Sequence, residues 1–101
     1  MTRRLHFNLD ALADLDDIAQ HTALESGSLD IANGFLDKLI TSCEKLAELP
    51  GIFGTGRPEL LPGMRSTPCQ TYLIFFRYQD DTVEIINILA GNRDLASHFD
   101  A

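Results

Sequence analysis

Arginines are the side chains in this sequence best suited to chemistry on a charged partner. Every basic residue after position 50 is an arginine: Arg57, Arg65, Arg77 and Arg93. A guanidinium group binds carboxylates and phosphates through paired hydrogen bonds, so these residues could contact phosphates, an acidic protein or acids of their own chain. Arg77 and Glu84 flank one predicted turn, which favours an ion pair between them over a binding role for Arg77.

The chain as a whole is acidic, which limits the partners that it can bind. Its 101 residues include 15 Asp and Glu against 8 Lys and Arg, for a net charge of −7 at pH 7. Proteins that bind nucleic acid need a basic surface that displaces the counterions around phosphates. Only the arginines could supply such a surface here, so direct nucleic-acid binding is not expected. No apolar run approaches the roughly 20 residues of a membrane span, so no membrane partner is expected either.

The other candidate reactive groups lack partners in the sequence. His6, His21 and His98 are scattered and do not have the spacing of metal ligands. Ser66 and Cys69 have no histidine base nearby in the sequence, which argues against a nucleophile. We therefore expect no metal and no cofactor. The two cysteines form no disulfide framework, which is typical of a cytoplasmic protein with free thiols.

Three aspartates near one helix start have a plain structural explanation. Asp14, Asp16 and Asp17 lie where the helix dipole favours negative charge, so the sequence indicates a solvated helix face rather than paired catalytic carboxylates. Cys43 lies on an apolar helical stripe and is expected in the core.

The first half of the sequence predicts a strand followed by two helices. Weak alternation over residues 3–8 indicates the strand. Apolar residues recur at helical spacing over residues 9–25, with Asn8 suited to cap the start and Gly27 suited to a left-handed helix end.

A second helix is expected to begin after Ser28 as its cap and to end at Pro50. Its apolar stripe comprises Ala32, Phe35, Leu36, Leu39, Cys43, Leu46 and Ala47. About two residues join the helices, so they should form an antiparallel hairpin. Gly34 costs about 1 kcal/mol relative to alanine inside a helix, which suggests close approach between the two helices.

The second half predicts a sheet. A loop rich in Gly and Pro is expected at 51–63. Three strands are expected to follow at 64–68, 71–78 and 82–90, and a short helix from Gly91 onward. Residues 1–101 are therefore expected to form one α+β domain. Its parts are an N-terminal strand, an antiparallel helical hairpin, a three-stranded antiparallel sheet segment and a short C-terminal helix.

The two longest predicted strands are apolar on both faces. Leu73 and Phe75 share one face of the first strand, and strict alternation places Ile86 and Ile88 together on the second, opposite Ile85. The helical hairpin can cover one face of such a sheet, but the short C-terminal segment cannot cover the other. A partner polypeptide is therefore expected there. The alternative is that sheet twist and the 51–63 loop hide enough of this face.

Four stretches of the sequence are similar to one family of small proteins. They are Pro62–Ser66, Tyr72–Tyr78, Val83–Ile85 and Ile88–Asp94, and their order and spacing are more specific than any one of them. On these residues the chain resembles, nearly from end to end, the ParE branch of the RelE/ParE superfamily, the toxins of bacterial type II toxin–antitoxin pairs. The resemblance implies a strand, a helical hairpin and an antiparallel sheet, in agreement with the predicted elements.

The resemblance also implies partners. In this family the antitoxin lays a C-terminal segment, part helix and part extended, over the toxin, which would cover the second apolar face. A ParD-like antitoxin is therefore expected, with contacts at Leu73, Phe75, Arg77, Ile86 and Ile88. DNA gyrase is the implied target, with Arg65 and Arg93 as candidate contacts.

The superfamily holds two activities. RelE-like members cleave mRNA on the ribosome, which needs a base, an acid and cations, whereas the ParE branch poisons gyrase by binding. Here Leu73 replaces a RelE-like arginine, Phe99 stands at the late tyrosine position and residues 51–101 lack lysine, although Arg93 is retained. We therefore expect a gyrase-binding toxin that is not an enzyme. The alternatives are a ribosome-dependent mRNA endoribonuclease and a non-toxic homologue that only binds its antitoxin.

Overall fold

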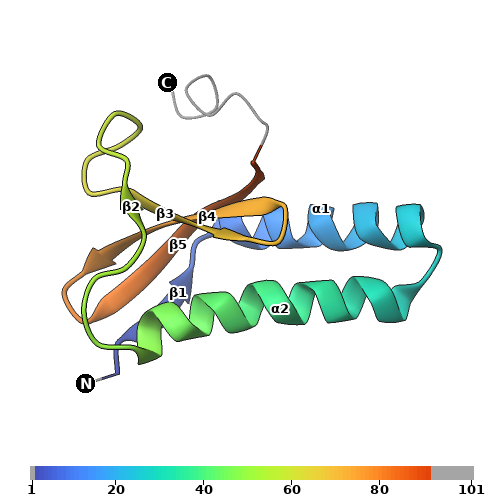
Figure 1. Cartoon of the computed structure of the whole chain (residues 1–101), viewed down its shortest axis with the longest axis horizontal. Helices are drawn as coiled ribbons and strands as arrows, with labels where there is room; N and C mark the ends of the chain where they lie inside the picture. The colour runs from blue at the N-terminus through green and yellow to red at the C-terminus, as the bar shows by residue number, and fades with distance from the viewer. Residues whose placement is uncertain (1, 92–101) are drawn as a thin grey trace.

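The structure is a computed structural model that describes residues 2–91. These residues form a helical hairpin and a five-stranded sheet (Figure 1). The elements are β1 (Arg4–Phe7), α1 (Leu9–Ser26), α2 (Leu29–Glu48), β2 (Thr55–Gly56), β3 (Arg65–Cys69), β4 (Tyr72–Gln79) and β5 (Thr82–Ala90). Figure 1 shows α1 and α2 side by side, with the end where they join projecting past the sheet. The predicted α+β class is confirmed. The predicted C-terminal helix lies outside the described residues.

Side-chain caps fix both helix starts and the connection between the helices. The Asn8 side chain accepts a hydrogen bond from the Ala11 amide at 3.1 Å, and the Ser28 hydroxyl accepts one from the Ile31 amide at 3.2 Å. Gly27 ends α1 in the left-handed conformation, with φ of 69°. These three residues satisfy backbone groups that a helix end leaves unpaired. The predicted caps and the two-residue connection are confirmed.

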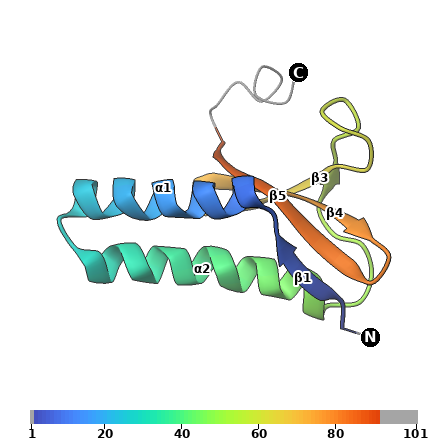
Figure 2. The same cartoon turned by 180° about the vertical axis from the view of Figure 1, so that it is seen from behind.

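The strands form one mixed sheet in the order β1-β5-β4-β3-β2. β1 runs parallel to β5, and the other neighbours pair antiparallel. Parallel strands need a long connection, which the helical hairpin and strands β2 to β4 supply here. Figure 2 shows β1 beside β5. The sequence predicts the N-terminal strand but neither its parallel place in the sheet nor β2, which lies inside the predicted 51–63 loop.

A β-bulge reverses the faces of β5 part-way along its length. Phe75 lies opposite Asn87 and Phe76 lies opposite Ile85, so Ile86 is an extra residue in β5. One inserted residue exchanges the faces of every side chain beyond it. Ile88 therefore joins Ile85 in the core beneath the helices. The prediction that Ile86 and Ile88 share a face is wrong, because it assumed unbroken alternation.

Both faces of the sheet bury apolar side chains. The face toward the helices holds the larger core, which includes Leu39, Ile74 and Phe76. The outer face holds a smaller cluster, in which Met64, Phe75 and Leu89 are buried and Leu60, Leu73 and Ile86 pack around them. The chain thus covers the middle of its outer face with its own residues, including Leu60 from the 51–63 loop. At Phe75 this packing favours the alternative that the chain hides its own outer face. Leu73 and Ile86 remain half-buried.

Two glycines give a matched test of this packing. A Cβ atom on Gly54 would lie 2.7 Å from the Ser66 carbonyl oxygen, and Gly54 has φ of +78°. A Cβ atom on Gly34 would meet nothing within 4 Å, so the suggested close helix approach at Gly34 is wrong. We expect Gly54→Ala to lower the free energy of unfolding by about 2 kcal/mol or more, and Gly34→Ala to raise it by about 1 kcal/mol. Urea unfolding measures both, and a Gly54→Ala protein as stable as the parent would contradict the close contact.

Candidate functional site

Arg65 organises the loop that precedes β2. Its Nε donates to the Phe53 carbonyl at 2.7 Å, and its Nη2 donates to the Gly54 carbonyl at 2.7 Å. The sequence predicts Arg65 as a contact to the target. In the structure its Nε and Nη2 are engaged within the chain and hold the loop in place. Contact between Arg65 and the target stays a prediction.

Arg57 and Arg77 also bind groups of their own chain. Arg57 Nε donates to the Ser66 hydroxyl at 2.9 Å. Arg77 Nε donates to Glu84 Oε1 at 2.7 Å, and the two residues are direct partners across β4 and β5. The predicted Arg77–Glu84 ion pair is confirmed. Each of these guanidinium groups therefore has at least one donor engaged within the chain.

A further arginine and a tyrosine anchor the segment that follows α2. Arg3 Nη1 donates to the Gly51 carbonyl at 2.8 Å, and its guanidinium carbon lies 4.4 Å from the centroid of the Tyr78 ring. The Tyr78 hydroxyl accepts a hydrogen bond from the Phe53 amide at 3.0 Å. The segment is therefore held at several points, yet it leaves the Ile52 side chain largely exposed.

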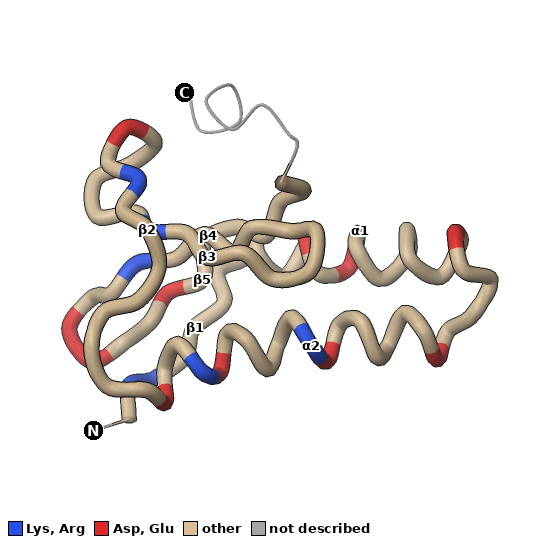
Figure 3. Tube along the Cα trace, viewed as in Figure 1, with Lys and Arg blue, Asp and Glu red and all other residues tan. Residues whose placement is uncertain are grey.

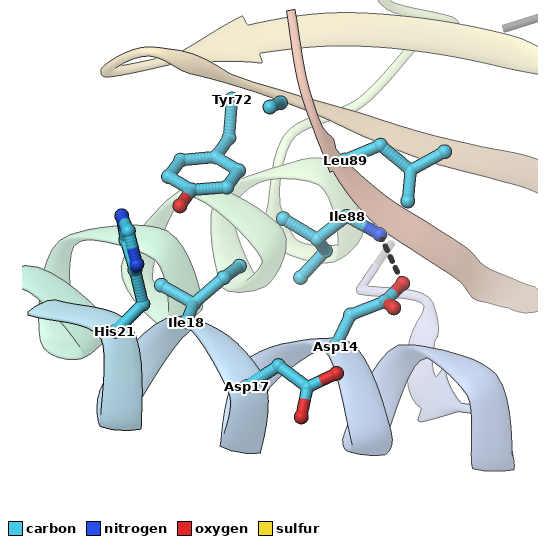
Figure 4. Close-up of a pocket in the computed structure, with 8 residues that line it drawn as sticks. Asp14, Asp17, Ile18, His21, Tyr72, Ile88 and Leu89 are labelled. Carbon is cyan, nitrogen blue, oxygen red and sulfur yellow. Dashed lines mark hydrogen bonds between the residues drawn. The ribbon is translucent and has the colours of Figure 1, made fainter. Parts of the chain in front are cut away.

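Beyond Ile85, one edge of β5 is not paired with any described strand. β1 pairs with β5 only as far as Ile85, whose carbonyl accepts from the Asn8 amide at 3.1 Å. Beyond Ile85, the Asp14 side chain of α1 bonds to this edge in place of a strand. Its Oδ2 accepts from the Ile88 amide at 2.9 Å (Figure 4). The same oxygen accepts from Asn87 Nδ2, also at 2.9 Å. A carboxylate thus satisfies a strand amide that would otherwise have no ladder partner.

Asp14 does not lie on a solvated face, so that prediction is wrong for this residue. It is half-buried, whereas Asp16 and Asp17 are exposed as predicted. A signal was present in the sequence, because Asp14 lies three residues after Ala11 and four before Ile18, both of which are buried. An acid at that spacing shares the buried stripe of its helix.

A groove of about 270 Å³ lies between α1 and the ends of β4 and β5. It is lined by Asp14, Asp17, Ile18, His21, Tyr72, Ile88, Leu89 and Ala90 (Figure 4). Phe35 supports the Tyr72 ring in an edge-on contact, with centroids 5.8 Å apart. Besides Tyr72 and His21, whose Nε2 lies 3.2 Å from Glu25 Oε1, the groove combines apolar side chains with two carboxylates. The two carboxylates suit a positively charged group that carries an apolar stem.

The thiols are not set up for catalysis. Cys43 is buried in the helix-facing core, as predicted, and burial raises its pKa to about 12. Cys69 is half-buried, with its sulfur 3.0 Å from the Ser42 hydroxyl. Within residues 2–91 no cluster of three His, Cys, Asp or Glu side chains could hold a metal ion, and neither helix could cross a membrane.

The predicted antitoxin contacts do not all reach the surface. Leu73 and Ile86 are half-buried on the outer face, where the alternation of β4 also places Arg77. Phe75 is fully buried beneath them, and Ile88 is buried on the opposite face. Arg93 lies outside the described residues. Contact with an antitoxin or a target stays a prediction for all these residues.

Comparison with known proteins defines the class. Residues 5–95 match the family of ParE toxins of the type II toxin–antitoxin system parDE, so the chain belongs to that family. Among solved structures it is similar to a chain described as the chromosomal ParDE toxin–antitoxin system from P. aeruginosa. The two are 24% identical, with a TM-score of 0.74 over 88% of this chain and 96% of that chain. No curated protein matches the sequence. The sequence-based resemblance to the ParE branch is thus confirmed.

Removing the Asp14 carboxylate should destabilise the fold. Asp14→Ala leaves the Ile88 amide and the buried Asn87 side chain without their acceptor. We expect a loss of about 2–3 kcal/mol in the free energy of unfolding, because hydrogen bonds to charged groups are strong and the donors left behind are buried. The exposed Asp16→Ala is the control and should change the value by less than about 0.5 kcal/mol. Equal effects in urea unfolding would contradict the role of Asp14.

Burial of Cys43 makes stability depend on alkaline pH. The thiol pKa is about 12 in the fold and 9.0 in its ordinary state, so the unfolded chain loses this proton first as the pH rises. The contribution of this group is complete below pH 9 and is lost as the pH rises toward 12. We expect the unfolding free energy of Cys43→Ala to fall less steeply over that range than that of the parent. Identical slopes would show that the thiol is not buried.

Proposed function

We propose that this ParE-family protein is a toxin that inhibits DNA gyrase by binding and is neutralised by a ParD-like antitoxin. It would act in the bacterial cytoplasm as a single toxin domain over residues 1–101. It would form a complex that blocks gyrase rather than catalyse a reaction, as the ParE branch is understood to do.

The observation that carries a binding function is the use of the arginines. Arg57, Arg65 and Arg77 each donate to a group within the chain at 2.9 Å or less. Metal-free RNA cleavage needs cations directed at a phosphate, together with an acid and a base. Arginines that already hold loops and strands do not supply such a site. The net charge of −7 also opposes docking onto ribosomal RNA.

The proposed antitoxin face is the outer face of the sheet. Leu73 and Ile86 would contact the antitoxin directly beside the Arg77–Glu84 pair, and Phe75 would support them from below. Half-buried apolar residues around a buried cluster gain further burial when a partner covers them. Ile88 belongs to the opposite face and supports the sheet from the side of the helices.

Expression and gyrase assays test the proposed function. Expression of the chain alone should arrest growth, and co-expression of the antitoxin encoded beside it should restore growth. Purified protein should cause cleaved DNA to accumulate on gyrase. Normal growth with folded protein present would contradict toxicity. Unchanged gyrase activity with cleaved mRNA in a translating extract would instead support an endoribonuclease.

Arg93 is the candidate target contact to test by substitution. Arg93→Ala should reduce growth arrest at least tenfold, because it removes a cation proposed to meet the target. Arg4→Ala is the matched control, since the Arg4 side chain is 83% exposed and its nearest acid, Asp81, is 3.8 Å away. Unfolding midpoints of both variants should be measured alongside toxicity. Full toxicity in Arg93→Ala would remove this residue from the proposed site and leave the family assignment intact.

A further inference from the structure

We infer that the groove between α1 and β5 binds a lysine or arginine side chain from an extended, basic segment of the antitoxin. This inference rests on the proposed function, because it assumes that an antitoxin exists. It adds a second contact surface, on the opposite side of the sheet from Leu73 and Ile86.

The acidic side chains of α1 favour a positively charged ligand. The helix contains the acids Asp10, Asp14, Asp16, Asp17 and Glu25 and no lysine or arginine. Figure 3 shows red segments and no blue ones along α1. Two of these acids, Asp14 and Asp17, lie one turn apart and both line the groove. A single positive group placed between them would interact with both carboxylates.

Asp14 keeps one oxygen available for such a cation. Both of its hydrogen bonds, from the Ile88 amide and from Asn87, end on Oδ2. Within residues 2–91 no hydrogen bond reaches its Oδ1. The carboxylate is already held in place by the strand, so binding a cation requires little further ordering.

The groove has the size and lining for a side chain rather than a cofactor. Its volume of about 270 Å³ lies below the range of about 300–1,000 Å³ that is typical of small-molecule sites. Ile18 and Ile88 are buried and give it an apolar floor, and the Tyr72 ring forms one wall (Figure 4). The aliphatic stem of a lysine or arginine can lie on such a floor while its charged end reaches the carboxylates.

The edge of β5 beyond the Asp14–Ile88 bond, with which no described strand pairs, favours an extended segment. No described strand pairs with β5 beyond Ile85 on this side, so a chain entering the groove would run beside Leu89 and Ala90. Extended peptides commonly bind along open sheet edges, where side-chain pockets give the specificity.

The other possible occupants fit the charge poorly. A second copy of this chain carries the same net charge of −7 and would bring a second acidic surface to the groove. A nucleic acid would place phosphates against Asp14 and Asp17. A basic protein segment complements the groove in charge and in shape.

Charge reversal at Asp17 tests the inference on the complete complex. Asp17 is exposed, so Asp17→Arg should fold, which thermal unfolding would check. We expect its affinity for the neighbouring antitoxin to fall at least tenfold. Asp16→Arg makes the same change in net charge at the adjacent, exposed position outside the groove, and should alter affinity less than twofold.

The salt dependence of binding gives a second readout. Affinity of the parent chain should fall as salt rises, and Asp17→Arg should weaken this dependence while Asp16→Arg should not. Absence of any complex with the parent chain would overturn the proposed function itself. A normal complex in which Asp17→Arg binds as the parent does would overturn the groove inference alone.

Discussion

The rest of the fold depends on how the chain satisfies the edge of β5 that β1 leaves uncovered. β1 covers β5 only to Ile85, and from there the Asp14 carboxylate replaces a strand by accepting the Ile88 amide. The same oxygen binds Asn87 beside the bulge, so one side chain joins α1 to the irregular part of the sheet. This contact sets the position of α1 against β5 and leaves a groove with an acidic margin.

Arginines near the sheet and acids on the helices have different roles in the fold. Arginines at the β2–β3 end hold loops by donating to backbone carbonyls and a serine, whereas acids gather on the helices. The first arrangement fixes the loops around β2 and β3. The second gives a surface that attracts basic partners. Both arrangements are consistent with the proposal that this ParE-family protein acts by binding.

Local signals in the sequence predict the helices well because their causes are local. Asn8, Gly27 and Ser28 cap or end helices through bonds to residues at most four positions away, and such bonds follow from residue type and spacing. The parallel place of β1 and the extra residue at Ile86 depend on contacts between distant segments. The role of Asp14 depends on them too, because its partners lie 73 and 74 residues away. The helical spacing of Asp14 shows that it faces inward, but not that a strand edge lies there.

Amide hydrogen exchange at Ile88 tests most directly whether Asp14 closes the edge of β5. If Asp14 closes this edge, the Ile88 amide is protected to the same degree as amides within the β4–β5 ladder. This protection is then lost in Asp14→Ala, while the ladder amides still exchange slowly. Rapid exchange of Ile88 in the parent protein, at the rate of an exposed loop amide, would contradict this closure of the edge.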